Sequence, residues 1–128
     1  MTKPKLLILD DDPLMVNIVV HVGETAGFSV YPTTTCLGFQ KEWIKNNPSV
    51  IVMDLVMPDM DGLELLTWLS VQKISAPVIL MSGYDGKYLG VAETLGSAKG
   101  ITIIGTLIKP FKIDDLELML KRALPSNS

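Results

Sequence analysis

The chain has 128 residues, of which 48% are hydrophobic, and it carries 11 basic against 14 acidic residues for a net charge of -3. This length fits one domain with a single core, and the acidic balance argues against direct contact with nucleic acid. No apolar run approaches the roughly 18 residues that a membrane span requires, and the one cysteine, Cys36, cannot form an internal disulfide. We therefore expect a soluble protein in the cytoplasm that does not bind a membrane.

Two hydrophobic periodicities alternate along the chain. Short apolar runs such as Val50-Ile51-Val52-Met53 are typical of parallel strands that are buried on both faces. Between them, apolar residues recur at helical spacing. In chain order, the pattern predicts strand 5–9, helix 14–26, strand 28–31, helix 37–45, strand 50–54, a helix opening at 61–62, strand 76–81, helix 84–95, strand 101–108 and helix 113–124.

Local signals mark several of the predicted boundaries. Pro13 fits the first turn of a helix, Gly27 ends that helix, and Asp61 is a plausible N-cap. The helix 84–95 is expected to turn Tyr88, Ala92 and Leu95 toward the core and to exit through 96–100. Five strands alternating with five helices predict a single α/β domain, doubly wound around a five-stranded parallel sheet. We expect it to span residues 1–124, with 125–128 as a tail or the start of a linker.

Four of the five predicted strands end on a polar residue or cluster. These are Asp10-Asp11-Asp12, Asp54, Ser82 and Lys109. Taken alone, Asp54 is as well explained as a helix cap or turn former. Because the carboxyl ends of parallel strands lie at one edge of a sheet, however, the four groups are expected to converge there. This convergence favours a functional site.

The chemistry of these residues predicts phosphoryl transfer. The carboxylates of Asp10, Asp11 and Asp54 would repel one another unless a cation joined them, and hard oxygen ligands suit Mg²⁺ better than zinc. His21 and Cys36 are not expected to bind metal, because His21 lies in a polar helix stripe and Cys36 stands alone. A carboxylate nucleophile, Mg²⁺, a lysine and a hydroxyl donor are the parts that phosphoryl transfer needs.

These motifs resemble the receiver domain of bacterial two-component response regulators, the CheY-like family. The resemblance is carried by Asp10-Asp11, by Asp54-Leu-Val-Met-Pro58-Asp-Met-Asp-Gly62, by Ser82 and by Lys109-Pro110-Phe111, and it covers about Lys5 to Leu124. It implies the flavodoxin-like strand order 2-1-3-4-5. It also implies a signalling phosphoacceptor that catalyses only its own phosphorylation and dephosphorylation.

The resemblance implies a role for each site residue. Asp54 would accept a phosphoryl group from a sensor histidine kinase or phosphotransfer protein, and Ser82 and Lys109 would contact the phosphoryl oxygens. Mg²⁺ would be bound by Asp54, by Asp11 directly, by Asp10 through water and by the backbone carbonyl of Val56. Asp12 is interpreted as a first-turn helix charge. Val56 and Tyr84 would flank the phosphoryl group and limit the entry of water.

The chain departs from the family pattern in two places. Thr106 occupies a position where the family commonly has an aromatic switch residue, so we expect the signal to travel by loop repacking. Ser82 and Lys109 are 27 positions apart, longer than usual, with the surplus around 96–101. The fourth helix is therefore expected to be longer or to end differently. This affects the face of the fourth helix, fifth strand and fifth helix, through which receivers dimerise or meet their outputs.

The segment from Ile104 to Pro110 resembles receivers that precede EAL-type cyclic-di-GMP phosphodiesterase domains. The chain is therefore either the excised N-terminal receiver of such a protein or a stand-alone receiver. Two other interpretations remain open. One is a receiver-like interaction module that is no longer phosphorylated. The other is a haloacid dehalogenase-like phosphatase with Asp10 as its nucleophile, which leaves Asp54 and Pro58 unexplained.

Overall fold

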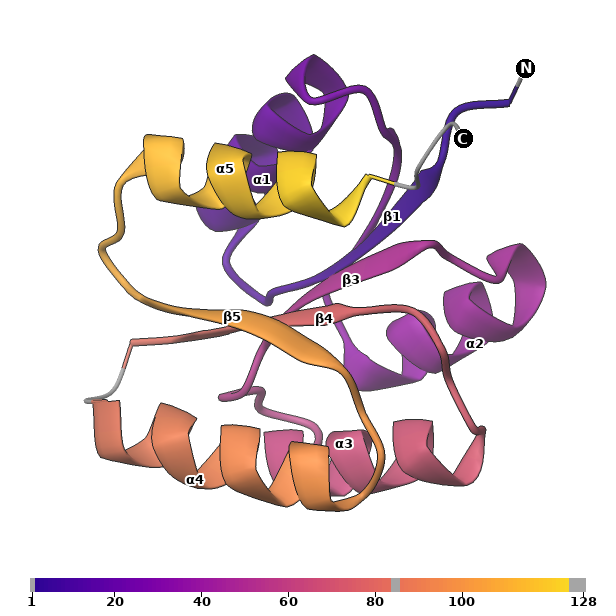
Figure 1. Cartoon of the computed structure of the whole chain (residues 1–128), viewed down its shortest axis with the longest axis vertical. Helices are drawn as coiled ribbons and strands as arrows, with labels where there is room; N and C mark the ends of the chain where they lie inside the picture. The colour runs from indigo at the N-terminus through magenta and orange to yellow at the C-terminus, as the bar shows by residue number, and fades with distance from the viewer. Residues whose placement is uncertain (1, 84–85, 125–128) are drawn as a thin grey trace.

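The computed structural model describes residues 2–83 and 86–124 of the chain. Within them, five strands alternate with five helices (Figure 1). The elements are β1 (Lys5–Leu9), α1 (Pro13–Thr25), β2 (Ser29–Thr33), α2 (Cys36–Asn46), β3 (Val50–Asp54), α3 (Gly62–Val71), β4 (Val78–Ser82), α4 (Gly86–Ala98), β5 (Ile103–Ile108) and α5 (Ile113–Ala123). The strands pair in parallel in the order β2-β1-β3-β4-β5. The predicted doubly wound α/β fold and its strand order are confirmed.

The sheet is covered by helices on both faces, as Figure 1 shows, with α1 and α5 on one side and α2, α3 and α4 on the other. The side chains of β1 explain this layering, because successive residues of a strand point to opposite faces. Leu6 and Ile8 join the apolar cluster beneath α1 and α5. Leu7 and Leu9 join the second cluster, beneath α2, α3 and α4. The central strand β3 is buried along its whole length, as its apolar run predicts.

β2 continues two residues beyond its predicted end at Tyr31. Pro32 and Thr33 belong to the strand, paired in register with Ile8 and Leu9. Proline cannot donate a hydrogen bond to a neighbouring strand, so a strand interior normally excludes it. β2 lies at the edge of the sheet, where one side of the strand has no partner to bond. Phe28, predicted as strand, precedes β2 and packs into the core instead.

The predicted exit of the fourth helix at 96–100 is wrong in its first part, because α4 continues through Ala98. Gly96 is buried inside the helix, and a Cβ atom there would lie 2.6 Å from Ile103 Cδ1. The glycine thus allows close packing of α4 on β5. The chain leaves the helix at Gly100, whose φ of 88° is strained for any other residue. The predicted start of this helix at Tyr84 lies outside the described residues.

Which residues of the helices face the core was predicted only in part. Ala92 is buried as expected, and Tyr88 is partly buried. Leu95 is 41% exposed, whereas Leu89 is buried. Ile44, an apolar member of the predicted second helix, is 68% exposed. Apolar residues thus occur on both faces of α2 and α4, which obscures the helical period in the sequence.

The fifth strand begins at Ile103, two residues after its predicted start. Its register against β4 shifts between Val78 and Ile79, which pair with Ile103 and Gly105, so that Ile104 is the additional residue. The segment 96–101, where the sequence predicts a length surplus, thus contains the last residues of α4 and lies just before this irregularity. Across residues 2–83 and 86–124, every helix is too short or too polar to cross a membrane.

Candidate functional site

The carboxyl edge of the sheet gathers the four polar groups that the sequence predicts. Asp54 and Ser82 are the last residues of β3 and β4, and Lys109 directly follows β5. The Lys109 amide donates a 2.8 Å hydrogen bond to the Ser82 carbonyl, and the Leu55 amide donates a 3.0 Å bond to the Met81 carbonyl. These backbone bonds extend the sheet past its last residues and fix the strand ends relative to one another.

Lys109 joins the two buried carboxylates of the site. Its Nζ lies 2.5 Å from Asp10 Oδ2 and 3.0 Å from Asp54 Oδ2. Asp10 is fully buried and Asp54 is 4% exposed. Burial disfavours the Lys109 ammonium, but the hydrogen bonds to Asp10 and Asp54 outweigh it and raise the pKa of Lys109. Lys109 is therefore a fixed positive charge at neutral pH.

Burial raises the pKa of Asp10, although its hydrogen bonds with Lys109 and with the Asp12 amide act in the opposite direction. The Asp12 amide donates to Asp10 Oδ1 at 3.0 Å. Asp12 itself is the N-cap of α1, where its Oδ1 accepts a 3.0 Å bond from the Leu14 amide. It therefore precedes the helix rather than lying in its first turn, which corrects the interpretation of Asp12 as a first-turn charge.

Three carboxylates can meet at one point of this edge. Asp10, Asp11 and Asp54 each offer an oxygen atom, and these atoms lie within 4.8 Å of one another. Asp11 is exposed, so the cluster is open to solvent on one side. Three carboxylates beside the single Lys109 ammonium leave a net charge of two negative units. Oxygen ligands, this charge and room for water fit Mg²⁺.

The loop that follows Asp54 bonds back onto it. The Val56 amide donates a 3.0 Å hydrogen bond to Asp54 Oδ1, which turns the chain sharply after β3. Val56 also forms an isolated antiparallel bridge with Asp61. Gly62 begins α3 directly against this turn, and a Cβ atom there would lie 2.5 Å from the Leu55 carbonyl oxygen. Only glycine fits this position without a shift of the backbone.

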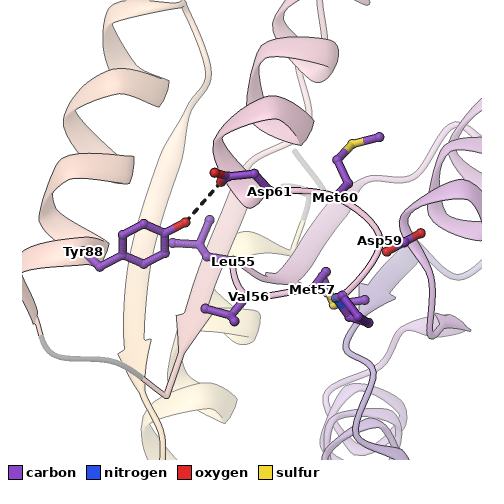
Figure 2. Close-up of a pocket in the computed structure, with 8 residues that line it drawn as sticks. Leu55, Val56, Met57, Asp59, Met60, Asp61 and Tyr88 are labelled. Atoms are coloured by element: carbon purple, nitrogen blue, oxygen red, sulfur yellow. Dashed lines mark hydrogen bonds between the residues drawn. The ribbon is translucent and has the colours of Figure 1, made fainter.

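A pocket of about 460 Å³ lies beside this loop (Figure 2). It is lined by residues 55–61 and by Tyr88 of α4. Tyr88 Oη donates a 3.2 Å hydrogen bond to Asp61 Oδ1, which also accepts the Leu63 amide at 2.8 Å. The predicted N-cap role of Asp61 is confirmed. Its bond with Tyr88 was not predicted, because no local sequence signal relates residues on two different helices.

The opposite side of the loop is fixed by α2. The Cys36 amide donates to both oxygens of Asp59, at 3.3 and 3.0 Å. The Cys36 thiol is buried, and this burial together with Asp59 raises its pKa to about 12. The sequence indicated no role for Asp59, whose contact with Cys36 joins residues far apart in the chain.

Thr106 and Tyr84 complete the predicted set. Thr106 is a partly buried residue of β5 that pairs in register with Leu80. Tyr84, expected to flank the phosphoryl group, lies outside the described residues. Val56, its predicted counterpart, is 36% exposed and lines the pocket.

The sequence matches a family model described as the response regulator receiver domain, over residues 6–121. It is 33% identical over 120 residues to the C4-dicarboxylate transport transcriptional regulatory protein DctD of Pseudomonas aeruginosa, covering 94% of the chain but only 25% of that protein. It is 27% identical over 128 residues to the sporulation initiation phosphotransferase F of Bacillus subtilis, covering 100% and 99% of the two chains.

Solved structures give the same result. A response regulator from Colwellia psychrerythraea superposes with a TM-score of 0.82 at 34% sequence identity, covering 94% of this chain and 96% of that one. The similarity thus extends over the sheet, the helices that cover it and the edge where the acidic cluster lies.

Proposed function

The chain belongs to the family of response regulator receiver domains, and from this membership we propose that Asp54 is the residue that accepts the phosphoryl group. One observation carries this assignment. Lys109 Nζ contacts Asp10 and Asp54 together, at the edge where Asp11 completes a carboxylate cluster. The proposed nucleophile Asp54 thus lies in direct contact with the positive charge of Lys109 and belongs to the carboxylate cluster.

In the proposed reaction, a carboxylate oxygen of Asp54 attacks the phosphorus of a phosphohistidine. The bond between phosphorus and the imidazole nitrogen breaks, and the imidazole leaves with the electron pair and takes up a proton. Lys109 offsets the charge of the phosphoryl oxygens, and the Ser82 hydroxyl donates to one of them. The Val56 amide holds Asp54 Oδ1, which orients the carboxylate for attack.

Receiver domains bind Mg²⁺ in an acidic pocket, and the carboxylates of this site fit such an ion. We assign its binding to Asp11 and Asp54 directly, to Asp10 through water and to the Val56 carbonyl. When bound, Mg²⁺ supplies positive charge to the phosphoryl oxygens. The chain itself positions these oxygen ligands and excludes solvent from Asp10.

Receiver domains are signalling modules rather than conventional enzymes, and we propose that this one catalyses only its own phosphorylation and dephosphorylation. Val56 and Tyr84 would limit the access of water to the phosphoryl group. The domain would span residues 1–124, and it would act in the cytoplasm. The predicted tail or linker at 125–128 lies outside the described residues. The phosphatase interpretation with Asp10 as nucleophile leaves Asp54 and Pro58 unexplained, and the family to which the chain belongs does not favour it.

Receiver domains interact with histidine kinases or phosphotransfer proteins and with output domains. For this chain we propose that phosphorylation draws Ser82 and Lys109 inward and changes the face formed by α4, β5 and α5, which would bind an output domain or a second copy. With Thr106 in place of an aromatic ring, the loops after β4 and β5 carry the change. The segment 104–110 supports an EAL-type phosphodiesterase domain as the output.

The test is the intact mass of the protein after incubation with Mg²⁺ and acetyl phosphate. We expect a gain of one phosphoryl group that disappears in Asp54→Asn and without Mg²⁺. Asp59→Asn, which changes a carboxylate of the neighbouring loop, is the matched control and should still gain the group. A gain that persists in Asp54→Asn, or its absence from the parent protein, would contradict the assignment.

A further inference from the structure

One side chain connects the first turns of α4 with the loop after Asp54. Figure 2 shows the Tyr88 ring extending from α4 toward Asp61 across the side of the pocket. Its hydroxyl donates a 3.2 Å hydrogen bond to Asp61 Oδ1. The same oxygen accepts the Leu63 amide as the N-cap of α3. Asp61 is therefore the point at which α3, α4 and the loop meet.

Backbone contacts lead from Asp61 to Asp54. Asp61 is paired with Val56 by the antiparallel bridge, and the Gly62 amide donates a 3.1 Å bond to the Leu55 carbonyl. The Val56 amide in turn donates to Asp54 Oδ1 at 3.0 Å. Because the loop is short and bonded at both ends, a displacement of Asp61 changes the position of Val56 relative to Asp54.

The two sides of the loop are fixed by different helices. On one side the Cys36 amide at the start of α2 bonds to Asp59. On the other side Tyr88 bonds to Asp61, whose bridge partner is Val56. The contact with α4 is thus the one that bears directly on Val56 and, through it, on Asp54.

We propose that the Tyr88 hydroxyl is a positioning group for the reaction at Asp54. It fixes Asp61, and through Asp61 it holds the Val56 backbone, whose amide orients Asp54 and whose carbonyl is assigned to Mg²⁺. A ligand held in place before binding loses less freedom when the ion binds, so its affinity is higher. This inference rests on the proposed function of Asp54.

The first test is amide hydrogen exchange in the metal-free protein, comparing the parent with Tyr88→Phe. Exchange at Val56 and Gly62 should become faster by roughly two- to tenfold, the range for loss of one hydrogen bond. Tyr31→Phe is the matched control, because it removes a hydroxyl on β2 from a residue that does not line the pocket. It should leave both amides unchanged.

The second test is a double-mutant cycle on the Mg²⁺ dissociation constant, measured by calorimetric titration. Tyr88→Phe should raise this constant by roughly two- to tenfold in the parent and leave it unchanged in an Asp61→Ala background. Asp61→Asn keeps an acceptor oxygen and a good N-cap, so it should retain most of the parent affinity. An equal effect of Tyr88→Phe in both backgrounds would overturn the proposal.

The two tests separate this inference from the function on which it rests. A parent protein that neither binds Mg²⁺ nor gains a phosphoryl group at Asp54 refutes the proposed function. Unchanged exchange at Val56 and Gly62 in Tyr88→Phe refutes the positioning role, whatever the parent binds. Faster exchange with unchanged Mg²⁺ affinity also refutes it, because the hydroxyl would then stabilise the loop without positioning the site.

Discussion

Replacement of Gly62 by alanine tests how closely α3 must approach the end of β3. The added Cβ atom would lie 2.5 Å from the Leu55 carbonyl oxygen and 2.7 Å from its Cα. Both are backbone atoms, so no rotation of a side chain relieves the contact. The chain must shift either α3 or the turn that holds Val56 next to Asp54.

The expected cost follows from two opposing effects. Overpacking a buried contact costs about 1–3 kcal/mol, while replacing glycine by alanine within a helix gains about 0.5–1 kcal/mol. The net loss in the free energy of unfolding is therefore between about 0 and 2.5 kcal/mol, with a middle value of about 1 kcal/mol. Gly90 is the matched control, because it lies within α4 with no atom near its added Cβ. Gly90→Ala should be stabilised by about 0.5–1 kcal/mol.

The assay is urea unfolding followed by tryptophan fluorescence. Trp43 of α2 and Trp68 of α3 form an edge-to-face pair with ring centroids 5.6 Å apart, so the signal reports directly on α3. We also expect folded Gly62→Ala to accept phosphoryl groups from acetyl phosphate more slowly than Gly90→Ala. If Gly62→Ala is as stable as the parent and equally reactive, the close approach is not required.

Three further predictions concern the charged and buried groups of the site. Asp10→Asn should stabilise the metal-free protein at neutral pH, because burial raises the pKa of Asp10 in the folded state; the gain should be full above the folded-state pKa and absent below the unfolded value of 3.8, as measured by urea unfolding across pH. Because the pKa of Lys109 is raised in the folded state, its contribution to stability should be present below pH 10.5 and should be lost as the pH rises through the folded-state pKa. Lys109→Met should not show this loss when its stability is measured at alkaline pH. The Cys36 thiol, with a pKa of about 12, should react with an aromatic disulfide reagent only as the protein unfolds, and rapid reaction under native conditions would contradict its burial.

Groups placed by regular structure were predictable from the sequence. Asp10, Asp54, Ser82 and Lys109 follow apolar runs, and the geometry of a parallel sheet brings the ends of such runs to one edge. The contacts of Lys109 with Asp10 and Asp54 follow from that geometry together with opposite charge. The prediction succeeded here because each step depended on a strongly periodic segment.

Features that depend on packing between elements were not predictable. Gly96 looked like a helix exit, yet it lies inside α4, where an added Cβ atom would contact the Ile103 side chain of β5. Leu95 and Leu89 are the same residue type, and only the position of α4 on the sheet determines that Leu89 is the buried one. Local sequence contains no information on such long-range contacts, so tertiary packing overrides it.

The charge arrangement explains how phosphorylation of Asp54 would change the positions of residues beyond Asp54. The Lys109 ammonium contacts the carboxylates of both Asp10 and Asp54. A phosphoryl group on Asp54 adds charged acceptor oxygens, which compete with Asp10 for the same ammonium. Because the Lys109 amide is bonded to the Ser82 carbonyl, movement of Lys109 toward the phosphoryl group shifts the end of β4 along with that of β5. The ends of β4 and β5 would therefore move together, without an aromatic residue at position 106.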